Sequence, residues 1–338
     1  MKNIEILDCT LRDGGYINNW DFGLKNIEYI ITTLALANIE YIECGFICDN
    51  TQDLNKTLYS NFERIKKIIK KYKSSTFTLM MPVNDYNIDN LEEAPNESNI
   101  VIRLSFHKND FSKAIDYALK IKNKGYKVFL QPTVIKSYTE EEIIYLLKGC
   151  NEVIKPDGVA IVDTLGEMNS NDICKITKLF DIYLDKKIKL LFHGHNNLQL
   201  AFSNSIIFIE NASDSREIII DTSLMGMGRN SGNVCTELMI NYLIQNYNKD
   251  YNFDKVLNII NDVMFSLREK YEWGYSPKYM LNAKNRTHPY YLDFLENSKI
   301  LDLNEINYVL SKIPNNEKPN FNKEIIHSLL SNDKISII

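Results

Sequence analysis

Residues 4–15 read IEILDCTLRDGG, a short apolar run that leads into charged residues and a glycine pair. Seven further apolar runs of similar length follow along the chain. They lie at 39–44, 76–81, 100–106, 127–133, 158–162, 189–193 and 218–222. Near-continuous apolar character is typical of parallel strands that are covered on both faces. We therefore predict eight parallel strands.

Amphipathic stretches fill the intervals between these runs. Apolar residues at 27, 30, 31 and 34 have helical spacing, and a second such pattern predicts a helix over 58–72. Thr139 and Glu142 have the spacing of a capping box before an apolar run. Gly125 stands where it would end a helix over 112–124. Strands and helices thus alternate along the chain.

Eight such units within about 230 residues predict an α/β fold, the (β/α)8 TIM barrel. The alternative, a doubly wound open sheet, is disfavoured because no G-x-G-x-x-G motif follows the first run. The strand pattern stops near residue 236, and a break rich in Pro, Asn and Lys lies at 314–320. We predict a TIM-barrel catalytic domain over 1–235 and a C-terminal helical region over 236–338.

The composition is that of an ordinary globular protein, with 338 residues, 44% hydrophobic and 25% charged. A net charge of −5 gives no reason to expect nucleic acid or a membrane surface as a partner. No stretch approaches the ~18 apolar residues of a membrane helix, and the N-terminus lacks the apolar core of a signal peptide. Six scattered cysteines without a C-x-x-C pair favour reduced thiols and a cytoplasmic location.

In a barrel the active-site residues follow the carboxyl ends of the strands. His193 and His195 are two residues apart, so both imidazoles lie on one side of an extended chain. The last strand of a closed barrel lies between the seventh and the first, so Asp13 comes within reach of both. Asn233 would add a neutral oxygen. This donor set favours Mn²⁺ or Mg²⁺ over Zn²⁺ or Co²⁺. The alternatives are two hydrogen-bonded structural histidines and an asparagine in a turn.

Two neighbouring features have a functional and a structural interpretation. Arg12 is either a cation that stabilises developing negative charge or half of an ion pair of small value. The glycine-rich stretch 226–233 either cradles a phosphate or carboxylate with its backbone N–H groups or forms a tight turn. It lacks the Lys-Ser/Thr ending of a P-loop.

Three motifs together resemble the DRE-TIM metallolyase superfamily: the stretch 7–15, the H-x-H-N of 193–196 and the G-x-G-x-x-x-G-N of 226–233. This superfamily, which is HMG-CoA lyase-like, includes isopropylmalate and homocitrate synthases and the 4-hydroxy-2-oxovalerate aldolases. Further motifs are most similar to those aldolases, which are class II pyruvate aldolases. They are Arg103-x3-His107, Asp163-Thr164 and Gly274-Tyr275-x3-Tyr279.

The resemblance implies a role for each matching residue. Asp13, His193 and His195 would hold a divalent metal, with Asn233 as a fourth ligand. Arg12 would stabilise an enolate and bind the substrate. The other implied substrate-binding residues are Thr164, at the 2-oxo-acid carboxylate, His107 and Tyr279, and the other implied catalytic residues are Glu43, Tyr16 and Tyr275. Either Tyr275 or Tyr279 would shape the aldehyde pocket. For Glu43 and His107 the alternative to direct contact with the substrate is that they support neighbouring site residues.

One departure from the aldolase pattern concerns the general base. The aldolases carry a histidine shortly after the Arg-Asp pair, where this chain has Tyr16. A tyrosine with an ordinary pKa of about 10 is a poor base at neutral pH. Either the pKa of Tyr16 is depressed beside the metal, or a metal-bound water or another residue takes the proton. We expect Trp20-Asp21-Phe22 to lie over the mouth, and His288-Pro289-Tyr290-Tyr291 to form a lid or an ordinary turn and helix.

The resemblance therefore predicts a metal-dependent carbon–carbon lyase. It would cleave or form a 4-hydroxy-2-oxo acid through a pyruvate enolate, with a small 2-oxo acid and an aldehyde as its partners. A Claisen-type acyltransferase of the isopropylmalate or homocitrate synthase kind is one alternative, although the chain lacks a regulatory domain of the usual size. A non-catalytic ligand-binding barrel is another. A homodimer or higher homo-oligomer is expected from the resemblance.

Overall fold

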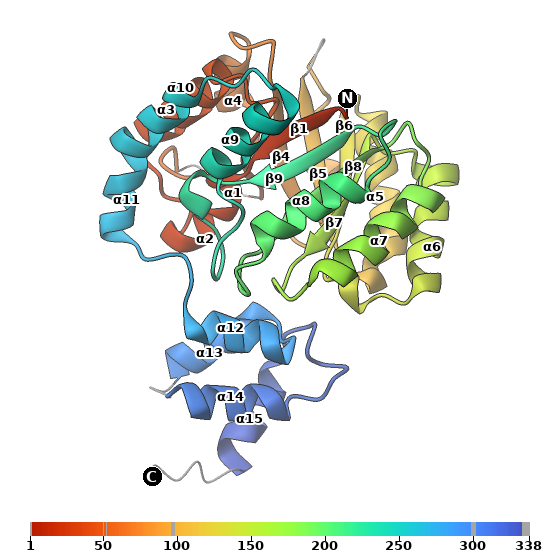
Figure 1. Cartoon of the computed structure of the whole chain (residues 1–338), viewed down its shortest axis with the longest axis vertical. Helices are drawn as coiled ribbons and strands as arrows, with labels where there is room; N and C mark the ends of the chain where they lie inside the picture. The colour runs from red at the N-terminus through yellow and green to blue at the C-terminus, as the bar shows by residue number, and fades with distance from the viewer. Residues whose placement is uncertain (1, 50, 52, 96–98, 299–301, 333–338) are drawn as a thin grey trace.

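Strand β1 (Ile4–Asp8) pairs in parallel with both β9 (Ile218–Thr222) and β2 (Tyr41–Ile47), and this double pairing closes the sheet into a barrel (Figure 1). The structure is a computed structural model that describes residues 2–49, 51, 53–95, 99–298 and 302–332. The barrel strands follow one another in the order β1-β9-β8-β7-β6-β5-β4-β2. The predicted TIM barrel is confirmed.

The remaining barrel strands match the predicted runs to within three residues at each end. They are β4 (Thr76–Pro82), β5 (Ile100–Phe106), β6 (Lys127–Pro132), β7 (Gly158–Asp163) and β8 (Lys189–Gly194). Each is apolar and buried because it lies between the barrel interior and the surrounding helices.

The predicted helix over 58–72 is wrong in its first part. Leu58–Tyr59 form a short strand, β3, which pairs with the end of β2, and the helix α4 runs over Glu63–Ile69. Thr57 anchors this strand, since its hydroxyl donates to the carbonyl of Leu11 at 2.6 Å. The backbone N–H and C=O groups of β3 are satisfied by pairing with β2 rather than by helical hydrogen bonds. The helical spacing of apolar residues does not reveal this pairing.

Helices follow the barrel strands along the chain and surround the barrel. They are α3 (Leu24–Leu36), α4, α5 (Phe111–Asn123), α6 (Glu140–Gly149), α7 (Ser170–Tyr183), α8 (Ala201–Asn211) and α9 (Thr236–Tyr247). The capping box of Thr139 and Glu142 is present at the start of α6. Gly125 follows α5 at φ +86°, the left-handed conformation that ends a helix. Two one-turn helices, α1 (Thr10–Asp13) and α2 (Gly15–Asn18), follow β1.

The C-terminal helices divide between two hydrophobic cores. The core of the barrel extends to Trp273, whereas a second core runs from Leu281 to Ile326. Helices α9, α10 (Phe253–Ile259) and α11 (Phe265–Lys270) therefore pack with the barrel, although the sequence boundary at 235 assigned them to the C-terminal region. Helix α9 buries Met239, Ile240 and Leu243 in the core of the barrel.

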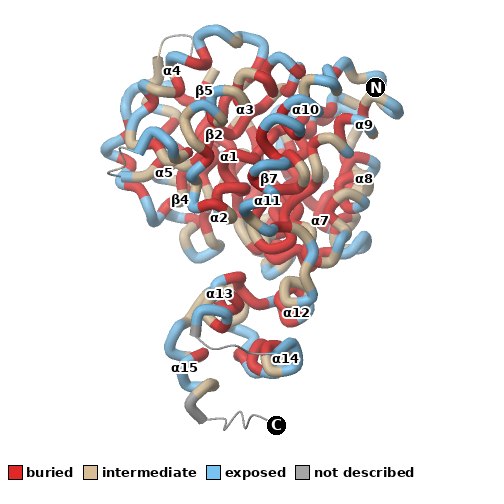
Figure 2. The backbone as a smooth tube through the Cα atoms, turned by 90° about the vertical axis from the view of Figure 1, so that its left-hand side faces the viewer, coloured by how far each residue is buried: buried red, intermediate tan, exposed pale blue. Residues whose placement is uncertain are grey.

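The second core belongs to a separate small bundle (Figure 2). It consists of α12 (Pro277–Asn285), α13 (Pro289–Ser298), α14 (Leu303–Lys312) and α15 (Lys323–Asn332). Its contacts to the barrel are made with loops that follow strands: Asn197 donates to the carbonyl of Tyr279 at 3.3 Å, and Arg286 lies 3.1 Å from Glu167. The bundle thus adjoins the carboxyl-end face of the barrel. Among the described residues, no helix has the length and hydrophobicity needed to cross a bilayer.

Candidate metal centre

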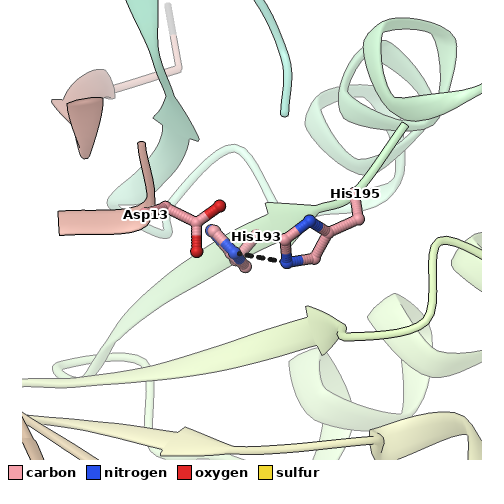
Figure 3. Close-up of side chains that lie close together, drawn as sticks. All are labelled: Asp13, His193 and His195. Carbon is pink, nitrogen blue, oxygen red and sulfur yellow. Dashed lines mark hydrogen bonds between the residues drawn. The ribbon is translucent and has the colours of Figure 1, made fainter. Parts of the chain in front are cut away.

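Three predicted metal ligands come together at the carboxyl ends of the strands (Figure 3). Asp13 ends the short helix after β1, His193 lies in β8, and His195 follows the end of that strand. One ligand atom from each lies within 4.8 Å of the others, and all three side chains are buried. The two Nε2 atoms of the histidines face each other at 3.3 Å. Such convergence of imidazole nitrogens and a carboxylate is suited to a divalent cation.

The charge states of Asp13 and His195 are those that a bound metal ion requires. Burial, together with the neighbouring histidine and arginines, lowers the pKa of His195 to about 4, although Asp13 opposes the shift. Burial favours protonation of Asp13, but Arg12 and the two histidines outweigh it and hold its pKa well below the usual range. Ligating histidines must be neutral and ligating carboxylates ionised. At neutral pH His195 is therefore neutral and Asp13 ionised before any ion binds.

His193 is oriented by Asp221, a residue that our sequence analysis did not single out. The Nδ1 atom of His193 lies 2.9 Å from Oδ2 of Asp221, which comes from the adjacent strand β9. Arg103 helps to lower the pKa of Asp221, so the carboxylate stays ionised despite its burial. A carboxylate behind a ligating histidine fixes the tautomer that exposes Nε2. Asp221 is a charged residue within the apolar run of β9, and this feature of the sequence could have identified it.

A chain of buried charges connects the two sides of the centre. Arg103 is fully buried, donates to Glu43 at 2.8 Å and pairs with Asp221. Glu43 also accepts from Nε of Arg12 at 2.8 Å, and Arg12 pairs in turn with Asp13. Glu43, predicted as catalytic, thus holds two arginines inside the barrel. This series of ion pairs connects Asp221, which lies against His193, with Arg12, which pairs with Asp13.

Asn233 lies beside Asp13 and His195. Its Nδ2 donates to Oδ2 of Asp13 at 2.7 Å, and its Oδ1 is buried without a hydrogen-bond partner among the described residues. A backbone bridge holds Asn233 beside His195. A buried oxygen with no donor is costly unless a cation or water satisfies it. Two imidazole nitrogens, a carboxylate and this amide oxygen therefore fit a divalent ion of the Mn²⁺ or Mg²⁺ type.

Gly228 is required by this close packing. A Cβ atom at this position would lie 2.2 Å from Nδ2 of Asn233 and 2.6 Å from Oδ2 of Asp13. Gly228→Ala is therefore expected to weaken Mn²⁺ binding about 10–100-fold, the usual effect of disturbing groups that orient metal ligands. Calorimetric titration with Mn²⁺ measures this, and the melting temperature of the ion-free variant controls for folding. Unchanged affinity would contradict the assignment of Asp13 and Asn233.

Aromatic side chains border the centre on its outer side. The indole of Trp20 donates to the carbonyl of Arg12 at 3.0 Å and packs against Tyr16, with the two ring centroids 4.9 Å apart. Crowding by protein raises the pKa of Tyr16 to about 12, with Asp13 adding to the rise and Arg229 opposing it. The surrounding protein groups by themselves thus favour the neutral phenol over the phenolate at Tyr16.

The other predicted residues, Thr164, His107, Tyr275 and Tyr279, make contacts of their own. The hydroxyl of Thr164 accepts the N–H of Val134 at 2.8 Å, and Nδ1 of His107 lies 3.1 Å from the hydroxyl of Thr133. Both bonds tie together the loops that follow neighbouring strands. Tyr275 is 56% exposed, and Tyr279 packs against the core of the C-terminal bundle.

Tyr290, from α13 of the bundle, contacts Arg229 of the glycine-rich loop 226–233. The Cζ atom of Arg229 lies over the ring of Tyr290 at 4.2 Å and over that of Tyr16 at 5.0 Å. Arg229 also pairs with Asp293 at 3.4 Å. Residues 289–291 begin α13 and Tyr291 lies in the bundle core, as the turn-and-helix interpretation expected, while Tyr290 contacts Arg229.

Comparison with known proteins gives a family-model match over residues 3–263, described as HMGL-like. The chain is 22% identical over 270 residues to the 4-hydroxy-2-oxovalerate aldolase of Bacillus thuringiensis (strain Al Hakam), covering 79% of this chain and 77% of that protein. It is 24% identical over 240 residues to the oxaloacetate decarboxylase of Mycobacterium tuberculosis (strain ATCC 25618 / H37Rv), covering 70% and 68%.

Solved structures give the same fold. The N-terminal domain of a proposed aldolase from Bacteroides vulgatus superposes with a TM-score of 0.74 at 27% identity, covering 89% of this chain and 98% of that one. The carboxyl transferase domain of Rhizobium etli pyruvate carboxylase superposes with a TM-score of 0.70 at 14% identity, covering 92% and 56%. The second likeness concerns the fold alone.

Proposed function

The chain belongs to the HMGL-like family, and we propose that it is a divalent-metal-dependent aldolase that cleaves or forms a 4-hydroxy-2-oxo acid through a pyruvate enolate. One observation carries this proposal: Arg12 lies against Asp13 within a buried cluster of two imidazoles and a carboxylate. Such a cluster fits an ion of the Mn²⁺ or Mg²⁺ type, and the arginine beside it offers positive charge for an enolate. The relatives named as aldolases and as a decarboxylase support carbon–carbon bond chemistry.

Asp13, His193 and His195 would hold the ion, with Asn233 as a further ligand. A bound divalent ion supplies Lewis acidity toward the carboxylate and keto oxygens of a 2-oxo acid. Arg12 contributes a fixed cation: although burial opposes it, Glu43 and Asp13 raise its pKa well above the ordinary value. Its Nε and Nη1 atoms are engaged by these carboxylates, and among the described residues Nη2 has no such partner, so it is proposed to meet the enolate oxygen.

In the cleavage direction the proton of the C4 hydroxyl leaves and the C3–C4 bond breaks. The aldehyde departs, and the electron pair of the broken bond stays on the pyruvate fragment as an enolate. Protonation at C3 then gives pyruvate. Since charge develops on the enolate oxygen, a preorganised cation in a water-poor mouth lowers the barrier. Thr164 and His107 are proposed to complete the substrate pocket from the neighbouring strand ends.

Tyr16 is proposed to donate a proton rather than act as a free base. With a pKa of about 12, its phenol stays protonated throughout the physiological range. In the condensation direction the aldehyde oxygen becomes an alkoxide and needs a proton, which a neutral phenol beside Arg229 can supply. In cleavage the reverse transfer would carry the proton of the C4 hydroxyl to the phenolate, which forms when the phenol releases its own proton to solvent.

Tyr16→Phe is expected to lower kcat about 100-fold, the usual contribution of a positioned proton donor. Because the pKa of Tyr16 lies near 12, the wild-type rate of condensation should show no limb from this group between pH 6 and 10. Steady-state rates across this pH range test both expectations. Tyr290→Phe is the matched control, since it also keeps a ring over Arg229, and its kcat should fall less than about threefold. Equal rates in both variants would contradict the role of Tyr16.

Pyruvate release from a panel of 4-hydroxy-2-oxo acids tests the proposed function. Release is followed by NADH oxidation with lactate dehydrogenase, in the presence of EDTA and after addition of Mn²⁺. We expect pyruvate formation that EDTA abolishes and Mn²⁺ restores. No pyruvate from any member of the panel, with Mn²⁺ bound by calorimetry, would reject the proposal. A homo-oligomer and a cytoplasmic location stay predictions, which light scattering and cell fractionation would test.

A further inference from the structure

Arg229 extends from the metal centre to the C-terminal bundle. It lies in the glycine-rich loop 226–233, and its backbone N–H is directed at Oδ2 of Asp13 at 3.3 Å. Its side chain reaches Tyr290 and Asp293 of α13. The guanidinium therefore lies about one arginine side chain beyond the metal ligands, on the side where the bundle adjoins the mouth.

The guanidinium is oriented but poorly satisfied. Rings of Tyr16 and Tyr290 flank it at 5.0 Å and 4.2 Å from Cζ, and its side chain is 15% exposed. A guanidinium carries five N–H donors. Among the described residues its acceptor is one oxygen of Asp293 at 3.4 Å, longer than the usual ~2.7–2.9 Å of a charge-assisted bond. Most of its donors therefore remain available to a ligand.

The groups around Arg229 also suit an anion. His288 is buried, and burial together with Arg229 and His107 lowers its pKa to about 3, so its ring is neutral. Its Nδ1 accepts the N–H of Tyr290 at 3.3 Å, which leaves the ring proton on Nε2 as a donor. Asp293, the one counter-charge paired with the Arg229 side chain in the described part of the chain, is 45% exposed. A ligand carboxylate or phosphate can reach the guanidinium and take the place of Asp293.

We propose that Arg229 forms an anion subsite for the aldehyde half of the substrate, so that the preferred aldehyde carries a carboxylate or phosphate a few bonds from its carbonyl. This inference rests on the proposed aldol reaction and adds the class of the second reactant. The planar guanidinium, in contact with two aromatic rings, offers a fork of N–H donors of the kind with which arginine binds carboxylate and phosphate. Asp293 is the internal group that the substrate anion displaces.

Aldehydes matched in size test the subsite in the condensation direction. With pyruvate and Mn²⁺ held constant, succinic semialdehyde is compared with butanal, and glyceraldehyde 3-phosphate with glyceraldehyde. Arg229→Gln is expected to raise the KM of the anionic aldehydes about 30-fold, the weight of a hydrogen bond to a charged group, and that of the neutral ones about threefold. Asp293→Asn removes the competing charge and should lower the KM of the anionic aldehydes. The anionic compound with the higher kcat/KM distinguishes carboxylate from phosphate.

The alternative role of Arg229 is a clamp between the bundle and the barrel. A clamp predicts that Arg229→Gln and Asp293→Asn weaken turnover of charged and neutral aldehydes alike, and this result would overturn the subsite. A wild-type enzyme that prefers neutral aldehydes would overturn it as well, while the proposed aldolase function would stand. No product from any aldehyde would reject both proposals.

Discussion

Arg103→Met is expected to lower the free energy of unfolding by about 3–5 kcal/mol, because it leaves two buried carboxylates without their common partner. Arg103 is fully buried and joins Glu43 to Asp221. Methionine has a similar length, so the loss reports on charge rather than on a cavity. Urea unfolding followed by circular dichroism measures the change.

Arg103→Lys is the matched control for this variant. It keeps the positive charge but cannot bridge both carboxylates with a planar fork, so a smaller loss of stability is expected. Mn²⁺ affinity should fall in Arg103→Met as well, since Asp221 orients His193. A change of less than 1 kcal/mol in Arg103→Met, on the order of an exposed pair, would contradict the view that this network is a single buried unit.

Arg12→Ala is expected to lower kcat about 1,000-fold while the protein stays folded and binds metal. Glu43 keeps Arg103 as a partner, and Asp13 keeps the hydrogen bond from Asn233, so neither carboxylate is left alone. The lost interaction is the cation that compensates the enolate, and removal of one such group costs about 100–1,000-fold or more. Pyruvate release gives kcat, and calorimetry gives the affinity for Mn²⁺.

Comparison of Asp13→Ala with Arg12→Ala distinguishes metal binding by Asp13 from stabilisation of the enolate by Arg12. Asp13→Ala removes a metal ligand, so both Mn²⁺ binding and turnover should be lost, whereas Arg12→Ala should lose turnover with a change in Mn²⁺ affinity of less than about tenfold. Wild-type kcat in Arg12→Ala would refute its role toward the enolate. Loss of Mn²⁺ binding in Arg12→Ala would make Arg12 a support of Asp13 instead.

Much of the fold and of the metal centre could be predicted because both follow from local patterns. Each barrel strand is a nearly unbroken apolar run, and a closed barrel brings the end of β1 near the end of β8. That topology alone associates Asp13 with His193 and His195. The two missed features of the fold, β3 and the packing of α9 on the barrel, depend on pairing between distant segments.

The supporting groups could not be predicted in the same way. Arg103 and Asp221 are 118 residues apart, and each interrupts an apolar strand without any local sign of its partner. The approach of Tyr290 to Arg229 depends on how the C-terminal bundle meets the barrel, which no periodicity encodes.

The measurement that tests the central claim most directly is exchange of the methyl protons of pyruvate in D₂O, followed by proton NMR. Enolate formation removes a proton from the methyl carbon, so exchange does not require the aldehyde to be known. We predict loss of the methyl signal with Mn²⁺ present, no exchange with EDTA, and none in Arg12→Ala or Asp13→Ala. Absence of exchange in the wild type, with Mn²⁺ shown by calorimetry to be bound, would contradict a pyruvate enolate at this site.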